Sequence, residues 1–380
     1  MQADTIGLYV HFPFCLRKCL YCDFPSYAHK DYLMGEYLTA LKVEIDNIKD
    51  KIGHRQINTV FLGGGTPTLF HEKELVWLLD YIKQGSTIRH GAEITIEANP
   101  ETLSPDMLEA LKQGGFNRLS IGMQACQDEQ LKALGRTHSI GDVERGVNWA
   151  KKAGFHNINL DLMFGLPNQT TDHWMESLVR AVGMGVEHIS TYALIVEEGT
   201  PFFELASRGG LNTPSEDVER EMYHRGAKYL TSLGYNHYEI SNFAKSGKEC
   251  KHNLIYWHNN EYIGVGSGAH SFLHGRRRWN YADIHQYIDE VRKNGDGTEQ
   301  WEVISPSDQR FETIMMGLRL NSGVSKKVFK KRFGHDLGYY YGSIIETLKI
   351  EGLLIETDSN IHLTARGMDL QNSVLLHFME

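Results

Sequence analysis

Three cysteines near the start of the chain have the spacing of a metal-cluster site. They stand in the string Cys15-Leu-Arg-Lys-Cys19-Leu-Tyr-Cys22, directly after the strand-like run Ile6–Phe12. Thiolates are soft donors that suit iron–sulfur clusters and zinc. Three cysteines this close in sequence can reach three corners of one iron–sulfur cube. The chain has five cysteines, an odd number, which argues against a disulfide framework and indicates a reducing compartment.

Two other interpretations of the cysteines stay open at this level. A structural zinc site needs a fourth protein ligand, and His11 and His29 are the nearest histidines in the sequence. The three cysteines could also be unrelated buried residues. Cys126 lies far from them in sequence, and we expect it to be a small buried hydrophobe.

The overall composition is that of a globular protein with two or three domains. The chain has 380 residues, of which 41% are hydrophobic and 23% charged, and its formal net charge is −9. This charge implies no general attraction to nucleic acid. The sequence lacks an apolar run of about 18 residues for a membrane span, and Asp4 falls where a secretory signal would carry a basic residue. We therefore expect a cytoplasmic protein.

Strand-like runs alternate with helical patterns in the first half of the chain, which predicts an α/β fold with a parallel sheet. Because parallel crossovers are right-handed, six such units favour an open, partial (β/α)6 TIM-like barrel over a doubly wound sheet. Ser104 with Pro105 predicts one helix start, and Ser139 another. The strands are predicted at Ile6–Phe12, Asn58–Leu62, Glu93–Glu97, Arg118–Met123, Asn157–Met163 and His188–Leu194.

The sequence predicts three segments. Residues 1–235 form the partial barrel, residues 305–380 form a small helical, winged-helix-like domain, and residues 236–304 form the segment that connects the two. Within the first two, we expect a helix at Ser215–Leu233 and a strand at Tyr238–Asn242. The C-terminal segment combines helices at Gln309–Leu320, Lys326–Phe333 and Tyr341–Leu348 with a hairpin of Leu353–Glu356 and Ile361–Leu363.

Polar residues follow the ends of successive predicted strands. The second strand ends in Gly63-Gly64-Gly65-Thr66, the third in Glu97, and the fourth in Gln124, with Arg136 just beyond; the fifth carries Asp161. Sites in barrels of this handedness lie where the strands end. Glycines let the backbone approach a ligand closely, and a carboxylate can accept from ribose hydroxyls. Together the set suits a charged, nucleoside-bearing ligand.

The segment from Tyr9 to Cys22 resembles the radical S-adenosylmethionine (radical SAM) superfamily. The resemblance implies a [4Fe–4S] cluster on the three cysteines, with the fourth iron left for S-adenosylmethionine (SAM), and a partial barrel of radical SAM type. It also implies which residues contact SAM: Tyr9, Tyr21, Gly64, Gly65, Thr66, Glu97, Gln124, Arg136 and Asp161.

Two features distinguish branches of this superfamily. Oxygen-independent coproporphyrinogen III oxidases carry a fourth cysteine two residues after the third, where this chain has Phe24. The string His252-Asn253-Leu-Ile-Tyr256-Trp257 resembles the HNxxYW signature of the HemW family of haem chaperones. Histidine is a standard axial haem ligand, and the aromatic pair offers flat apolar faces. The alternative is structural, with His252 and Asn253 capping a turn and the aromatics filling the core. Three further residues near the motif carry donor atoms: Cys250, His258 and His270.

The resemblance implies a protein that binds haem and transfers it to acceptor haemoproteins. These acceptors would include respiratory haemoproteins, and the protein would contact the membrane-associated ones transiently. The alternative function is an oxidase that decarboxylates coproporphyrinogen III with a SAM-derived radical. A third is a nucleic-acid-directed enzyme using the basic stretch Lys326–Arg332. Residues 305–380, however, carry nine lysines and arginines against nine aspartates and glutamates, so no nucleic-acid partner is expected.

Overall fold

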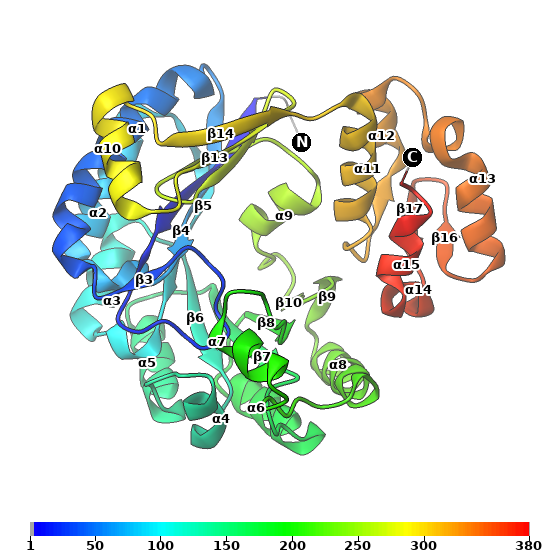
Figure 1. Cartoon of the computed structure of the whole chain (residues 1–380), viewed down its shortest axis with the longest axis horizontal. Coiled ribbons are helices and arrows are strands. Elements are labelled where there is room, and N and C mark those ends of the chain that lie inside the picture. The colour runs from blue at the N-terminus through cyan, green and yellow to red at the C-terminus, as the bar shows by residue number, and fades with distance from the viewer. Residues whose placement is uncertain (1–3, 380) are drawn as a thin grey trace.

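The core of the protein is a curled, mostly parallel sheet with helices on its convex side (Figure 1). The computed structural model describes residues 4–379. Residues 1–3 and 380, at the ends of the outer predicted segments, lie outside the described residues. The six predicted strands are present, parallel and in sequential order, which confirms the partial barrel. They are β1 (Thr5–Phe12), β4 (Gln56–Gly64), β5 (Ile88–Ala98), β6 (Arg118–Gln124), β7 (Ile158–Phe164) and β8 (His188–Ala193).

The helices that connect these strands pack their apolar faces on the sheet. Ser104 accepts from the backbone of Met107 at the start of α3, with Pro105 at the first helical position, as the sequence predicts. The connecting helices are α1 (Met34–Ile52), α2 (Glu72–Gly85), α3 (Pro105–Gly114), α4 (Asp128–Ala133), α5 (Ile140–Lys152) and α6 (Thr171–Gly183), with 3-10 turns at Asp31–Leu33, Pro67–Leu69 and Pro100–Thr102. Two further helices, α7 (Pro201–Ser207) and α8 (Glu216–Ser232), follow β8.

The segment 236–304 extends the sheet at both edges. At one edge, β9 (Asn236–Glu239) and β10 (Asn242–Ala244) form an antiparallel hairpin beside β8. The predicted single strand Tyr238–Asn242 is therefore wrong, because the chain turns within it. At the other edge, β11 pairs parallel with β1, and three antiparallel strands follow. These elements are β11 (Tyr262–Val265), β12 (His270–Leu273), β13 (Arg276–Asn280), α10 (Ile284–Asn294) and β14 (Thr298–Val303).

A short helix, α9 (Lys251–Trp257), lies on the concave side of the sheet (Figure 1). A Cβ on Gly7 of β1 would come within 2.6 Å of Ile255, so this glycine gives the helix room to approach the strand. The buried carboxylate of Glu93 on β5 accepts from the backbone N–H groups of Lys251 and His252, both at 3.1 Å. These bonds satisfy orphan donors of the first helical turn. Helix α9 is therefore held inside the barrel by its N-terminal end.

The C-terminal domain has its own apolar core and the predicted arrangement of helices followed by a hairpin. The predicted Lys326–Phe333 helix is present with the same bounds. The first helix starts earlier than predicted, because Ser305 caps it and Pro306 opens it. The elements are α11 (Pro306–Gly317), β15 (Val324–Ser325), α12 (Lys326–Phe333), α13 (Leu337–Ile350), β16 (Leu354–Glu356), β17 (Asn360–Leu363), α14 (Ala365–Asp369) and α15 (Gln371–Leu376).

The C-terminal domain is fastened to α9 and to β9. Arg332 donates to the carbonyl of Asn259, just past the end of α9, and the Arg319 guanidinium lies 5.4 Å from the Trp257 ring centre. The backbone of Leu320 bridges to Glu239, so the domain also covers the β9 edge of the sheet. Among the described residues, none of the helices has both the length and the apolar character needed to cross a membrane.

Replacing Glu93 by alanine is expected to destabilise the protein by about 2–4 kcal/mol, because the backbone donors of α9 would lose their buried acceptor and the buried Arg118 would lose a nearby negative charge. The measurement is urea unfolding followed by circular dichroism. The Glu93→Gln variant keeps an acceptor oxygen, so its loss of stability should be clearly smaller. Equal losses in the two variants would contradict the capping role.

Candidate functional site

The cysteine loop is held at the carboxyl end of the sheet by the pairing of its own ends and by backbone contacts with two other segments. Its two ends pair as a short parallel ribbon, β2 (Phe14–Cys15) with β3 (Tyr27–Ala28). The Leu20 N–H donates to the carbonyl of Leu134 at 3.0 Å, and the Phe202 N–H donates to the carbonyl of Leu20 at 3.0 Å. The loop therefore has a defined shape, while all three cysteines stay half-buried.

Polar side chains from the neighbouring strand ends contact the cysteine sulfurs. The Thr66 hydroxyl lies 3.8 Å from Cys15 Sγ, and Arg136 Nη1 lies 3.6 Å from Cys19 Sγ. The Asn99 side chain joins these two residues: Nδ2 donates to Thr66 Oγ1 at 2.9 Å, and Oδ1 accepts from Arg136 Nη1 at 3.0 Å. A positive charge and a hydroxyl beside the sulfurs suit thiolates, so the donor set fits an iron–sulfur cluster.

The glycine-rich end of β4 is shaped by close backbone approach. Gly64 has φ +110°, which disfavours any other residue, and a Cβ there would lie 2.4 Å from the His11 ring. A Cβ on Gly65 would lie 2.5 Å from the carbonyl oxygen of Phe14. The two glycines thus let β4 pass directly beneath the start of the cysteine loop. Gly64 and Gly65 lie next to Thr66, and all three residues are predicted to contact SAM.

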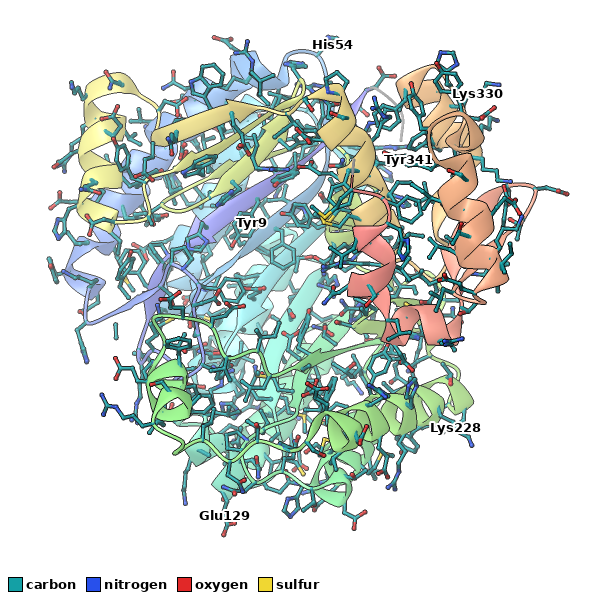
Figure 2. The ribbon with its side chains drawn as sticks, turned by 45° about the vertical axis from the view of Figure 1, so that its right-hand side comes forward. Tyr9, His54, Glu129, Lys228, Lys330 and Tyr341 are labelled. Atoms are coloured by element: carbon teal, nitrogen blue, oxygen red, sulfur yellow. The ribbon has the colours of Figure 1, made fainter. Side chains whose placement is uncertain are left out.

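A hydrogen-bonded chain connects the barrel interior to the cysteine loop. The Tyr9 hydroxyl lies 2.9 Å from His11 Nδ1, and His11 Nε2 lies 2.8 Å from the carbonyl of Pro25. Since that carbonyl can only accept, Nε2 carries the proton and Tyr9 donates to Nδ1. Burial lowers the pKa of His11 to about 4, so the ring stays neutral. Figure 2 shows Tyr9 inside the barrel.

A small polar cavity of about 190 Å3 lies within the barrel, below the cysteine loop. Glu97 and Asp161, two of the predicted SAM contacts, share it. Ser120 Oγ and Asn159 Nδ2 donate to Asp161 at 2.9 and 2.8 Å, and the Gly64 N–H donates to Glu97 at 2.9 Å. The lining residues are Tyr9, Phe61, Glu97, Arg118, Ser120, Asn159, Asp161, Ser190, Tyr192, His252, Asn253 and Tyr256.

The HNxxYW residues lie on helix α9, and three of them, His252, Asn253 and Tyr256, line the same cavity. His252 is buried; its Nδ1 lies 2.7 Å from Thr59 Oγ1 and its Nε2 lies 2.8 Å from the Tyr256 hydroxyl. Both ring nitrogens are therefore occupied within the protein. Burial lowers the pKa of His252 to about 3, which keeps the imidazole neutral. Trp257 points away from the cavity toward Arg319 of the C-terminal domain.

The remaining sequence-predicted residues occupy different positions. Gln124 has φ +62°, and its Nε2 lies beside Gly122 at the end of β6. Tyr21 packs near Phe202, with ring centres 6.5 Å apart. Cys250 is buried beside Glu93 and is not exposed to a ligand. Cys126 is buried in the apolar core, as predicted.

The zinc interpretation finds no support in the surroundings of His11, whose two nitrogens are engaged within the protein. Within residues 4–379, no three Cys, His, Asp or Glu side chains come close enough to share one metal ion. A cube does not require this, because its three thiolates bind three different irons.

Sequence reasoning missed Asn99, Thr59 and Glu93 as parts of the site. Asn99 connects two of the cysteine contacts, and the other two hold α9 in place. Asn99 lies two positions after Glu97, so the same strand-end argument could have found it. No local signal marks Thr59 or Glu93, since their partners are more than 150 residues away.

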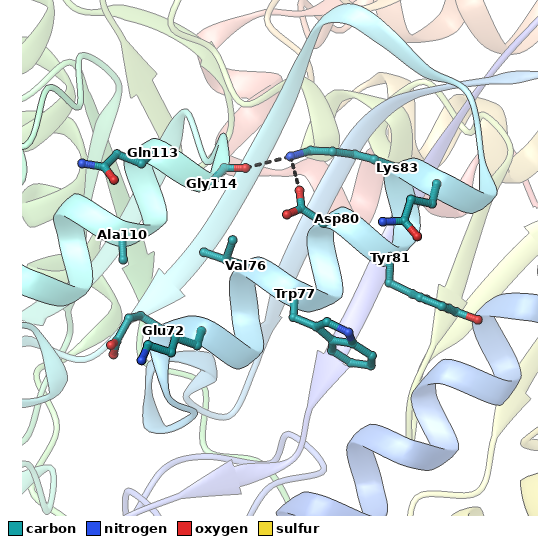
Figure 3. Close-up of a pocket in the computed structure, with 11 residues that line it drawn as sticks. Glu72, Val76, Trp77, Asp80, Tyr81, Lys83, Ala110, Gln113 and Gly114 are labelled. Atoms are coloured by element: carbon teal, nitrogen blue, oxygen red, sulfur yellow. Dashed lines mark hydrogen bonds and ion pairs between the residues drawn. The ribbon is translucent and has the colours of Figure 1, made fainter.

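A larger hollow of about 680 Å3 lies outside the barrel, between α2 and α3 (Figure 3). Lys83 bridges it by donating to Asp80 at 2.9 Å and to the carbonyl of Gly114 at 2.7 Å, and Trp77 stands beside it, half-exposed. Its lining contains no cysteine or histidine. We therefore do not connect it with the cluster site.

Comparison with known proteins assigns the family. The model of the radical SAM superfamily matches residues 9–181, and that of the HemN C-terminal domain matches residues 304–370. A curated relative from Bacillus subtilis (strain 168), named heme chaperone HemW, is 40% identical over 98% of this chain and 98% of its own length. The chain belongs to the HemW family of radical SAM proteins.

Other relatives agree with the HemW assignment. Proteins named heme chaperone HemW from Lactococcus lactis and Mycobacterium tuberculosis are 36% and 33% identical over 100% and 99% of this chain, and over 98% and 95% of their own lengths. The structure of coproporphyrinogen III oxidase (HemN) from Escherichia coli superposes with a TM-score of 0.86, covering 99% of this chain and 90% of that one at 23% identity. This likeness confirms the fold.

If Cys15, Cys19 and Cys22 each hold one iron of a cluster, replacing any of them singly by alanine should remove most of the iron bound after anaerobic reconstitution. Iron and sulfide analysis provides the measurement. Cys126→Ala is the matched control and should keep the full iron content. A triple variant of the loop cysteines with wild-type iron would disprove the site.

Glu97 gives a pH-dependent prediction. Burial and the neighbouring Asp161 raise its pKa from 4.5 to about 7. Its ionised form therefore costs folding free energy, which appears as pH rises above 4.5 and is complete above about 7. Glu97→Gln in the metal-free protein should gain up to about 3 kcal/mol at pH 8 and nothing at pH 4. Urea unfolding at pH 8 and at pH 4 measures the change in stability. Replacing the exposed Glu109 by glutamine is the control, and it should leave the stability unchanged at both pH values.

Proposed function

We propose that this protein binds haem and transfers it to acceptor haemoproteins, and that it carries a [4Fe–4S] cluster and SAM. The observation that supports this most directly is the full-length similarity to proteins named heme chaperone HemW, at 40% identity for the Bacillus subtilis relative. The convergence of three cysteines above a polar cavity supports the cofactors.

Cys15, Cys19 and Cys22 would hold the cluster and leave one iron without a protein ligand. A reduced cluster of this kind supplies an electron to SAM when both are bound. The residues of the chain bind and orient the ligand. The backbone at Gly64 and Gly65 would contact its methionine end, and Glu97, which lines the cavity, would accept from its ribose hydroxyls. Asp161, Tyr9, Gln124 and Tyr21 are assigned to the same ligand by the family resemblance.

The HNxxYW motif is proposed to serve haem handling through the shape of α9. His252, Asn253 and Tyr256 line the barrel cavity, while Trp257 packs toward the C-terminal domain. The helix therefore joins the SAM cavity to the domain that we propose contacts acceptors. With His252 engaged on both nitrogens, the motif orders this region without presenting a free imidazole.

The oxidase remains the second candidate, because the fold is shared with the Escherichia coli enzyme. Phe24 stands where those oxidases carry their fourth cysteine, and its side chain is 59% exposed beside the cluster loop. This difference favours haem handling over porphyrin oxidation. We propose that the protein acts in the reducing cytoplasm, with haem and acceptor haemoproteins as partners.

The C-terminal domain supports a protein partner over a nucleic acid. Of its basic stretch, Arg332 turns inward to the carbonyl of Asn259, and Lys326 pairs with Glu356 at 2.9 Å. Only part of the stretch therefore faces solvent, and the domain as a whole has no excess positive charge.

Haemin titration of the reconstituted protein tests the proposal. We expect saturable binding with a defined Soret band, followed by transfer of the haem to apomyoglobin. Incubation with coproporphyrinogen III, SAM and a reductant under anaerobic conditions should give no decarboxylated product. Absence of saturable haemin binding together with product formation would reject the chaperone function in favour of the oxidase.

A further inference from the structure

The motif cavity fits a haem poorly. His252 has no free ring nitrogen, and its imidazole is about 1% exposed. The cavity it lines holds about 190 Å3, below the roughly 300–1,000 Å3 of pockets that take drug-sized ligands. A tetrapyrrole belongs to that larger size class. A haem ligand therefore has to present its lone pair on a more open surface.

His270 satisfies this requirement beside the cluster loop. It is the first residue of β12, and its side chain is exposed. Among residues 4–379, neither of its ring nitrogens has a hydrogen-bond partner. Burial of part of the ring and the nearby Arg277 lower its pKa, so the imidazole is neutral at pH 7 and its lone pair is available.

The backbone before His270 is firmly anchored next to the site. The Gly266 N–H donates to the fully buried Glu44 carboxylate at 2.8 Å, and the Ser267 N–H bonds to the Tyr37 hydroxyl, which itself donates to the carbonyl of His11. A Cβ on Gly268 would lie 2.8 Å from Pro25 of the cysteine loop. His270 is therefore held close to the end of β1 and to the residues that follow Cys22.

An aromatic partner fixes the ring of His270. Trp279 on β13 is its direct cross-strand neighbour, and the two rings stack at 5.9 Å with 23° between their planes. Such a stack limits rotation of the imidazole and provides a flat apolar surface beside the free nitrogens. Phe24, whose side chain is 59% exposed, precedes Pro25 in the adjoining loop and adds apolar surface there.

We propose that His270, steadied by Trp279, is an axial ligand of the haem iron at the mouth of the barrel. This inference rests on the proposed haem binding. It places haem beside the cysteine loop and assigns the buried His252 to positioning α9. The exposed side of the haem would then face solvent, where an acceptor can reach it.

Haemin titration of the full-length, reconstituted protein and its variants tests the proposal. His270→Ala should weaken haemin binding at least tenfold and shift the Soret band of the bound form. His270→Met should restore binding with a different spectrum, because methionine sulfur also ligates haem iron. His274→Asn is the matched control: this exposed histidine lies in the same hairpin with φ +52°, a conformation that asparagine tolerates, and should leave affinity and spectrum unchanged.

His252→Ala separates this proposal from ligation by the motif. We expect a lower unfolding temperature with the Soret position of bound haemin preserved. A wild-type spectrum and affinity in His270→Ala, or a spectral change confined to His252→Ala, would overturn the assignment of His270. If the wild-type protein itself binds no haemin, the proposed function fails as well, and the two failures are thereby distinguished.

Discussion

The hydrogen-bonded chain through Thr66, Asn99 and Arg136 is the interaction on which the site depends most. It joins the ends of β4 and β5 to the segment after β6, and its two outer members touch the sulfurs of Cys15 and Cys19. The positions of the Cys15 and Cys19 sulfurs are therefore tied to the ends of these strands.

The barrel interior contains buried polar and charged side chains, and the backbone of α9 donates hydrogen bonds to one of them, Glu93. A packed barrel of this type is normally filled by layers of branched apolar side chains. This one instead buries Glu93, which accepts from the backbone of α9, His252, which bonds to Thr59, and Arg118, which lies near the charge of Glu93. Unpaired, each would be costly. The helix occupies part of the barrel interior and lines the cavity of about 190 Å3 that lies there.

The sequence predicted the six barrel strands, the helix starts and most of the strand-end residues, because hydrophobic patterns and capping residues are local signals. It did not predict β11 to β14, since these strands are short and the run Arg276–Arg278 reads as surface. The placement of α9 was also out of reach, because Gly7, Thr59 and Glu93 meet it only through the fold. The turn inside Tyr238–Asn242 was missed for want of a glycine or proline.

The pairing of β1 with β11 has a consequence for how the molecule is made. Gly7 lies opposite Tyr262, so the first strand to leave the ribosome waits for a neighbour about 250 residues later, which at roughly 5–20 residues per second takes on the order of 10–50 seconds. The loop containing the cysteines is synthesised early too, yet its supports at Leu134, Phe202 and Gly268 arrive late. The cysteine loop therefore acquires its full set of supports only after the chain has been synthesised beyond Gly268.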